Sequence, residues 1–362
     1  MSLYLDHNAT TPVAAEVLQA MADAERAFPG NPASQHSAGR AAKATLEDAR
    51  EEISQLLGAS PDDAVILTSG GTEANNLALL GLAGENPARI LISAIEHPSV
   101  DAPAERLRTL GWDVVKIPVD SSGLLRREQL AQMLQTPTRL VSVIYGNNET
   151  GVLQPLEEIV TACHAAGAAV HTDAVQVAGK MPLDFSSLGV DAMTVTAHKF
   201  HGPRGIGALI LRPGVRLAPR LFGGQQQGAL RPGTESVALA IGLLEALRIW
   251  KRYADEIQSR LAKLRETFES HLCQQLPDVV IHSAEAPRLP HTSAIGFPGL
   301  NRQQLLMALD TAGIACSAGS ACASGSTDPS PVLMAMGCKG DVLEGSLRFS
   351  FGRDQQEAEA RA

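Results

Sequence analysis

Lys199 stands at the end of a short apolar run and just before a glycine-proline turn. The run 194–197 predicts a buried strand, and the turn follows at 202–203. Most lysines are solvated surface charges, and that is the ordinary interpretation of a single lysine. At the mouth of a buried strand and beside His198, however, the pKa of the amine can fall until it is a nucleophile that forms a Schiff base. The position of Lys199 therefore indicates covalent chemistry on a carbonyl compound.

A lysine of this kind indicates pyridoxal phosphate as its carbonyl partner, and this cofactor needs an acid that keeps its pyridine nitrogen protonated. Asp173 fits because it ends the apolar run 168–172, and open α/β sheets bind ligands at the carboxyl ends of their strands. Gln176, three residues later, can reach the phenolic oxygen of the ring. Taken alone, an aspartate after a strand is more often a turn residue or a helix cap. The combination with Lys199 favours a cofactor site.

The segment 65–82 offers a place for the cofactor phosphate. An apolar run leads into Gly70, Gly71, Thr72 and Glu73, and a helical pattern follows from Ala74. The first turn of a helix has unpaired N–H groups and a partial positive charge, which suit a phosphate dianion. An ordinary strand-to-helix turn would have the same composition. The sequence contains no Gly-x-Gly-x-x-Gly and no Walker loop, so a nucleotide enzyme is disfavoured.

Composition places the chain among globular proteins. It has 362 residues, of which 44% are hydrophobic, enough for one large core and a smaller one. Thirty basic and 39 acidic residues give a net charge of -9, so we expect no direct binding of nucleic acid. No apolar run approaches the roughly eighteen residues of a membrane span. Five cysteines without a Cys-x-x-Cys pair indicate a reducing, cytoplasmic location rather than a disulfide framework or a zinc site.

The alternation of short apolar runs with helical patterns predicts an α/β fold. Runs near 64–68, 89–93, 113–117, 140–144, 168–172, 191–195 and 207–211 alternate mostly with helical patterns. Short helical crossovers imply a mainly parallel seven-stranded sheet, with the last run as a candidate antiparallel strand. A long amphipathic stretch, 237–272, then leads to a smaller α+β domain with strands near 279–281, 294–297, 314–316 and 347–350. We expect a large cofactor-binding domain at 14–250 and a small domain formed by 1–13 and 251–362.

Cys322 lies in the segment 315–330, which is rich in glycine, serine and alanine. A free cysteine is usually a small buried hydrophobe, and this is the ordinary interpretation of Cys322. Its neighbours are too small and polar to form a core, so we expect its thiol to be accessible. Cys316, Cys163 and Cys273 lie in strand-like or helical patterns that better suit burial.

These features occur among a series of motifs that extends along nearly the whole chain. In order, they are Asp6-His7-Asn8-Ala9-Thr10-Thr11-Pro12, Gly30-Asn31-Pro32, Gly71-Thr72-Glu73, Glu96-His97, Asn147-Asn148-Glu149-Thr150-Gly151, Asp173-Ala174-Val175-Gln176, His198-Lys199, Arg231-Pro232-Gly233-Thr234-Glu235, Gly319-Ser320-Ala321-Cys322 and Arg348-Phe349-Ser350. With them the chain resembles the cysteine desulfurases of the class V aminotransferase family, fold type I of the pyridoxal-phosphate enzymes, in the branch that includes NifS and IscS. The Ser-Ala-Cys motif on a long loop is similar to this branch in particular.

The resemblance implies a set of residue roles. Lys199 would bind the cofactor covalently, Asp173 would pair with the pyridinium nitrogen, Gln176 would contact the phenolic oxygen and His97 would stack on the ring. The phosphate would be bound by Gly71, Thr72, Thr196 and His198, with Thr234 reaching it from the neighbouring subunit of a homodimer. Arg348 would hold the substrate carboxylate with help from Asn148, because a guanidinium can bind a carboxylate through two parallel hydrogen bonds. Taken alone, these last two would be a surface arginine and a turn asparagine, and His97 a helix-start or core histidine.

The implied reaction converts L-cysteine to L-alanine and leaves its sulfur on Cys322 as a persulfide. Cys322 must attack as a thiolate, so we expect His97 or the cofactor environment to assist its deprotonation. The sulfur would pass to acceptor proteins for iron-sulfur clusters, tRNA thiolation or DNA phosphorothioation, a choice that the sequence leaves open. We also expect mobility of the segment 319–328, because a thiol that delivers sulfur must travel.

Two alternatives remain open at the level of the sequence. One is another lyase or aminotransferase of the same superfamily, such as a selenocysteine or cystine lyase, which would not use a protein persulfide. The other is a catalytically idle relative that acts as a binding or assembly subunit. A normal rate of sulfide release by Cys322→Ser would favour the first, and a protein that neither turns yellow nor forms alanine would favour the second.

Overall fold

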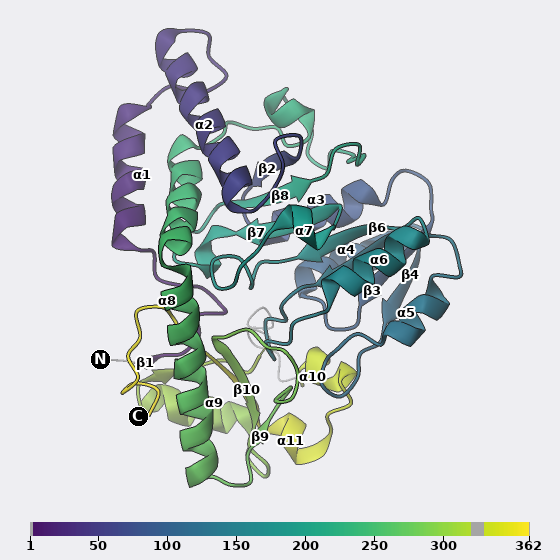
Figure 1. Ribbon diagram of the computed structural model, residues 1–362, viewed down its shortest axis with the longest axis vertical. Helices are drawn as coiled ribbons and strands as arrows, with labels where there is room; N and C mark the ends of the chain where they lie inside the picture. Colours follow the sequence, from purple (N-terminus) through teal and green to yellow (C-terminus); the bar gives the residue numbers. More distant parts are fainter. Residues whose placement is uncertain (1–2, 320–328, 362) are drawn as a thin grey trace.

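A seven-stranded sheet forms the centre of the computed structural model, which describes residues 3–319 and 329–361 (Figure 1). The strand order is β2-β8-β7-β6-β5-β3-β4; β8 pairs antiparallel with β2 and β7, and the other pairs are parallel. The bounds are β2 Ala64–Thr68, β3 Arg89–Ser93, β4 Asp113–Ile117, β5 Thr138–Ile144, β6 Ala169–Asp173, β7 Ala192–Thr196 and β8 Gly207–Leu211. The predicted mainly parallel sheet, with its last strand reversed, is confirmed.

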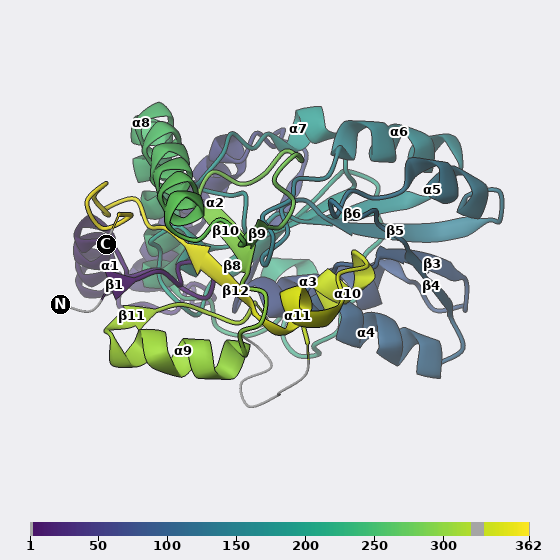
Figure 2. The same cartoon turned by 90° about the horizontal axis from the view of Figure 1, so that it is seen from below.

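Helices cover both faces of this sheet, as Figure 2 shows in a view along its edge. On one face Ile90 and Ile92 of β3 lie in a hydrophobic cluster with α3 and α4, and on the other face Leu91 joins a cluster with α2, α6 and α8. This alternation follows from the two-residue period of a strand. The large-sheet helices are α1 Ala15–Ala27, α2 Ser37–Leu56, α3 Gly71–Leu82, α4 Pro98–Thr109, α5 Arg127–Met133, α6 Leu156–Ala165 and α7 Phe185–Leu188. Strands buried on both faces explain the nearly continuous apolar runs.

A second, smaller set of strands lies beside the lower half of α8 (Figure 1). One sheet has the order β12-β10-β9, antiparallel throughout, and β1 pairs in parallel with β11. The bounds of these elements are β1 Leu3–Tyr4, β9 Val280–Ile281, β10 Thr292–Gly296, β11 Ile314–Ala315, β12 Ser346–Ser350, α9 Arg302–Thr311, α10 Pro331–Ala335 and α11 Gly340–Glu344. A separate hydrophobic cluster, which includes Leu264, Ile295 and Phe349, forms its core.

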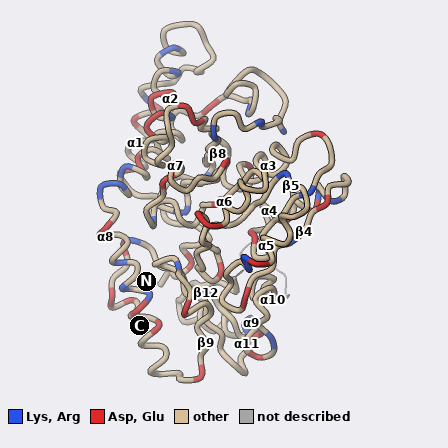
Figure 3. The backbone as a smooth tube through the Cα atoms, turned by 45° about the vertical axis from the view of Figure 1, so that its right-hand side comes forward, with Lys and Arg blue, Asp and Glu red and all other residues tan. Residues whose placement is uncertain are grey.

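The helix α8, Val237–Gln275, packs against the large sheet at its start and against the smaller strands further on. Its backbone leaves the helical region at Tyr253, where φ is -122° and ψ is 22°. The predicted division between 250 and 251 falls two residues before this kink, and it stays a prediction. In the described part of the chain, no helix combines the length and the apolar character needed to cross a bilayer. Acidic and basic residues are intermixed along the chain (Figure 3).

Candidate active site

The carboxyl ends of β6 and β7 and the start of α3 open onto one cavity of about 500 Å³. This volume is in the range of small-molecule sites. The residues that the sequence predicts and that line it are Gly71, Thr72, His97, Asn148, Asp173, Gln176, Thr196, His198, Lys199 and Arg348. They come from both the large sheet and the smaller strands, since Arg348 lies on β12. The structure therefore brings together residues that are far apart in the sequence.

Asp173 is the last residue of β6 and is 3% exposed. Its Oδ2 accepts a hydrogen bond of 2.7 Å from Asn75 Nδ2, and its Oδ1 accepts one of 2.9 Å from the backbone N–H of Val175. Asn75 Nδ2 also donates to Ser99 Oγ at 2.8 Å. The aspartate is thus held in one orientation by α3. Sequence reasoning missed Asn75 and Ser99, because nothing in a helical pattern marks an asparagine as a partner of a distant carboxylate.

His97 caps the start of α4 and also lines the cavity. Its Nδ1 lies 2.7 Å from Ser99 Oγ and accepts a hydrogen bond of 3.1 Å from the backbone N–H of Ser99. Burial lowers the pKa of His97, and the charges of Lys199 and Arg348 lower it further, while Asp173 acts in the opposite direction. The imidazole is therefore held at the cavity in its neutral form at neutral pH. It is a helix cap and a cavity residue at once.

The start of α3 forms a cradle that lines the cavity. Gly70 precedes the helix with φ at +150°, a conformation that favours glycine. A Cβ on Gly71 would lie 3.0 Å from Val175 Cγ2, closer than an ordinary van der Waals contact, so a side chain here would require its neighbour to move. The first-turn N–H groups of Gly71 and Thr72 have no intrahelical acceptor, which is the usual anion-binding arrangement. Thr196 and His198 line the same cavity.

Lys199 ends a short 3₁₀ helix, η1 Ala197–Lys199, that continues β7. Its Nζ donates to the backbone oxygens of Asn8 at 2.5 Å and Ala9 at 2.9 Å. The N-terminal segment therefore receives the amine, a contact that sequence reasoning did not foresee. Burial lowers the pKa of His198 to about 4, and the positive charge of Lys199 contributes to that shift.

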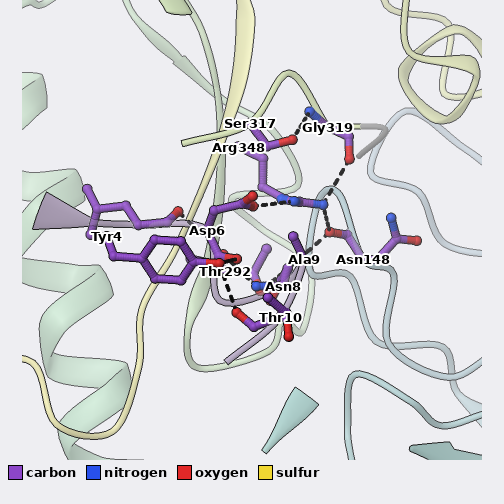
Figure 4. A network of polar contacts seen from close by, with 12 residues as sticks. Tyr4, Asp6, Asn8, Ala9, Thr10, Asn148, Thr292, Ser317, Gly319 and Arg348 are labelled. Atoms are coloured by element: carbon purple, nitrogen blue, oxygen red, sulfur yellow. Dashed lines mark hydrogen bonds and ion pairs between the residues drawn. The ribbon is translucent and has the colours of Figure 1, made fainter. Parts of the chain in front are cut away.

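Arg348 is 2% exposed and lies at the centre of the network in Figure 4. Its Nη1 donates to the backbone oxygens of Asn148 at 3.0 Å and Gly319 at 2.8 Å, and its Nη2 forms an ion pair of 2.6 Å with Asp6 Oδ1. Its buried Nε has no hydrogen-bond partner among the described residues. The guanidinium is thus fixed at the wall of the cavity, with Asp6 as the counter-charge.

Two predicted site residues are not placed in the cavity. Thr234 is exposed and lines a different hollow, together with Asn31 and Gln227, so its role stays a prediction. Cys322 lies outside the described residues, as does most of the segment 319–328 for which we expect mobility. The described residue that precedes this segment, Gly319, is the one bound by Arg348.

The donor set fits pyridoxal phosphate. The cavity has an amine at Lys199, a carboxylate at Asp173 for a pyridinium, an imidazole at His97 and an anion cradle at Gly71 that a side chain would fill. It also has Arg348, a cation with an unpartnered buried nitrogen. Among residues 3–319 and 329–361, no cluster of histidine, cysteine or acidic side chains is arranged to bind a metal ion.

Comparison with known proteins agrees with this chemistry. Residues 3–362 match the aminotransferase class-V family. The chain belongs to this family. Among the relatives of this class-V chain is a protein named cysteine desulfurase IscS from Dictyoglomus turgidum, 37% identical over 97% of this chain and 89% of the relative. A solved structure of a NifS-like protein superposes with a TM-score of 0.92 at 34% identity, covering 99% of this chain and 96% of that one. Another, titled SspA in complex with cysteine, has a TM-score of 0.85 at 30% identity, covering 97% and 99%.

Class-V aminotransferases and cysteine desulfurases depend on pyridoxal phosphate. The fold of this chain, a mainly parallel seven-stranded sheet with helices on both faces, is that of the fold-type I enzymes among its structural neighbours. The resemblance to the NifS and IscS branch of the cysteine desulfurases, predicted from the motifs, is therefore confirmed.

Proposed function

We propose that this protein is a pyridoxal-phosphate-dependent cysteine desulfurase. It converts L-cysteine to L-alanine and retains the sulfur on Cys322 as a persulfide. The observation that carries the proposal is the convergence of Lys199, Asp173 and Arg348 on one cavity, in a chain whose family includes named cysteine desulfurases. The solved relative with bound cysteine supports the choice of substrate.

Each residue of the cavity has a defined task in this reaction. When bound, pyridoxal phosphate supplies an electron sink for negative charge at the substrate Cα. Lys199 would hold the cofactor and carry the proton removed from Cα. Asp173, fixed by Asn75, would keep a proton on the pyridine nitrogen. His97, neutral at neutral pH and accepting the Ser99 N–H at Nδ1, would lie against the ring, and its Nε2–H could donate to the Cys322 thiolate and so favour deprotonation of the thiol.

Arg348 would bind the carboxylate of the substrate, with Asn148 beside it. Because the guanidinium already binds Asp6 and two backbone oxygens, the incoming carboxylate replaces part of an existing set of hydrogen bonds. This arrangement keeps the buried charge paired in every state, which avoids the large cost of an isolated buried cation.

The sulfur transfer is balanced within the protein and its substrate. The thiolate of Cys322 attacks the substrate sulfur, the bond between that sulfur and the substrate Cβ breaks, and the electron pair of that bond stays with the carbon fragment. Protons complete the products, which are alanine and a persulfide on Cys322. No external oxidant or reductant is needed. The persulfide would then pass to an acceptor protein.

We also propose that the enzyme works as a homodimer in the cytoplasm. Thr234 is exposed and does not line the cavity of its own chain, which supports a contact with the cofactor phosphate of a second copy. A reducing compartment suits the mechanism, because Cys322 must be a free thiol before each turnover.

The test is to incubate the purified protein with pyridoxal phosphate and L-cysteine, quantify alanine and locate the persulfide by mass spectrometry. We expect alanine and sulfide in equal amounts in the presence of a thiol reductant, with the persulfide on Cys322. Cys322→Ser should lose both products, whereas Cys273→Ser, a cysteine of α8, should keep them. Undiminished sulfide release by Cys322→Ser would favour a lyase without a protein persulfide, and a protein that forms no alanine would contradict the proposal.

A further inference from the structure

Lys180 is a buried lysine that the proposed mechanism does not use. It is 5% exposed and ends the turn 174–180 that follows β6. Gly179 directs it inward, with φ at +70° and a backbone so close to Phe200 that a Cβ would lie 2.3 Å from the Phe200 Cβ. Only glycine fits this position without strain. The chain is therefore built to bring the amine of Lys180 under the cavity.

The amine of Lys180 meets the side-chain amide of Gln176. Nζ donates to Gln176 Oε1 at 2.8 Å, and Gln176 Nε2 donates to the backbone oxygen of Asn8 at 3.0 Å. Both ends of the amide are thus assigned by their partners, since Nζ offers hydrogen atoms and the carbonyl of Asn8 can only accept. One N–H of Nε2 remains for the cavity, which Gln176 lines.

Burial of an amine costs free energy, so we expect Lys180 to have a role beyond packing. Within the described part of the chain Lys180 forms no ion pair. Burial lowers its pKa well below the ordinary value, and the charges of Lys199 and Arg348 act in the same direction. Lysine is rarely buried without a charged partner, and an apolar side chain of similar length would fill the same space at a lower cost.

We propose that Lys180 is a positioning residue that fixes the orientation of the Gln176 amide, so that an N–H and not the C=O faces the phenolic oxygen of the cofactor. This inference rests on the proposed function, because it requires pyridoxal phosphate in the cavity. A donor at that oxygen stabilises its deprotonated form. It therefore lowers the pH at which the proton shared between the phenolic oxygen and the Lys199 nitrogen is lost.

The test is the pH dependence of the visible absorbance of the holoenzyme without substrate. In Lys180→Met the Oε1 of Gln176 loses its donor, and only the hydrogen bond from Nε2 to Asn8 still orients the amide. We expect the midpoint of the absorbance change to rise by up to about one pH unit, the limit for loss of one hydrogen bond to a charged group. Lys180→Arg, which retains a donor, should keep the midpoint close to the wild-type value. Lys251→Met, a change of an exposed lysine on α8, should leave the midpoint unchanged.

A double-mutant cycle separates positioning from a direct effect of charge. If Lys180 acts through Gln176, Gln176→Ala raises the midpoint, and adding Lys180→Met to it produces no further shift. An equal shift in both backgrounds would mean that the amine acts directly, and it would overturn the inference. So would an unchanged midpoint in Lys180→Met. If Lys180→Met does not fold, Lys180→Gln is measured in its place with the same expectation.

The proposed function is judged separately in this experiment. A wild-type protein that gains no visible absorbance with pyridoxal phosphate contradicts the proposed function itself. A yellow wild-type protein whose Lys180 variants titrate like the wild type contradicts only the role of Lys180.

Discussion

Arg348 is a buried charged side chain for which we propose a role in substrate binding. Its two terminal nitrogens bind three protein oxygens, of which only Asp6 Oδ1 carries a charge. A substrate carboxylate that binds the two terminal nitrogens in parallel would displace a backbone acceptor from Nη1 and share Nη2 with Asp6, and its charge-assisted hydrogen bonds would offset that loss. In the proposed reaction, recognition of the α-carboxylate would depend on this one guanidinium.

Replacement of Arg348 by lysine tests that interpretation. A lysine keeps the charge but loses the two parallel hydrogen bonds, so we expect KM for L-cysteine to rise about tenfold to a hundredfold with a smaller change in kcat. Steady-state measurement of alanine formation gives both constants. Arg216→Lys, a change at an exposed position, is the matched control and should leave both unchanged. A variant that loses kcat while its KM stays the same would contradict a role in carboxylate binding.

At the scale of elements, much of the architecture follows from the sequence. The central strands were predictable because each is an apolar run between turns, and a strand buried on both faces needs no polar alternation. The strand β1, Leu3–Tyr4, and the one-turn helix α11 were not predicted from the sequence. Their positions depend on distant partners, such as β11 for β1.

The candidate site was predictable only in part, for a similar reason. Lysine, aspartate and glycine at strand ends are visible in the sequence, since their neighbours show which positions are buried. The sequence does not identify the partners Asn75, Ser99 and Lys180, because their roles depend on hydrogen bonds to residues that only the fold brings close. From the sequence, a polar residue in a helical pattern is expected to be exposed to solvent, and only the structure shows that it is buried.

The junction of β2 and α3 carries a prediction about cofactor affinity. In Gly71→Ala the new methyl group would lie 3.0 Å from Val175 Cγ2, so either Val175 or the first turn of α3 must give way slightly. Overpacking of this kind costs about 1 to 3 kcal/mol, and we expect the affinity of the apo-protein for pyridoxal phosphate to fall roughly fivefold to a hundredfold. Equilibrium titration followed by visible absorbance measures it. Val175→Ala in the same chain should recover part of the loss; if it recovers none, the contact with Val175 is not the cause.

At the scale of the whole molecule, buried histidines link stability to pH. Burial lowers the pKa of His171 to about 3 and of His282 to about 4, and lowers that of His291 well below its usual value. Between these values and about 6.5 the unfolded chain binds more protons than the native one, so stability falls as pH falls through this window. Glu96 and Glu149 act in the opposite direction, because burial raises the pKa of each and the native state binds the extra proton.

The histidine effect is measurable one residue at a time. For His171, held between Ser142 and Thr194, each pH unit below about 6.5 should lower the free energy of unfolding by about 1.4 kcal/mol. Urea unfolding of the apo-protein at pH 7.5 and 5.5 gives the difference. We expect this difference to be smaller by about 1 kcal/mol in His171→Gln, and unchanged in His271→Gln. If the free energy of unfolding falls equally between pH 7.5 and 5.5 in the wild type and in His171→Gln, this histidine does not contribute.

The proposed homodimer makes the strongest prediction about the assembled molecule, because it links association to cofactor binding. Phe222 is 87% exposed and Leu221 is 49% exposed, an unusual pair on the surface of a monomer. They lie in the segment 217–235, which also carries Thr234 and is tied to the first turn of α3 by an ion pair of 2.8 Å between Arg231 and Glu73. A second copy that covers this segment would bury the phenylalanine and bring Thr234 toward a phosphate site at once.

Phe222→Ser should therefore weaken the dimer and the retention of cofactor together. A two-fold interface loses the phenylalanine twice, at about 2 kcal/mol each, so the dissociation constant should rise about a thousandfold. Sedimentation velocity with absorbance detection follows mass and bound cofactor in one experiment. Met307→Ser, which removes a 70% exposed apolar side chain on α9, should change neither quantity. A wild-type monomer would contradict the dimer, whereas a monomeric Phe222→Ser that holds its cofactor as tightly as the wild type would contradict the role of Thr234 across the interface.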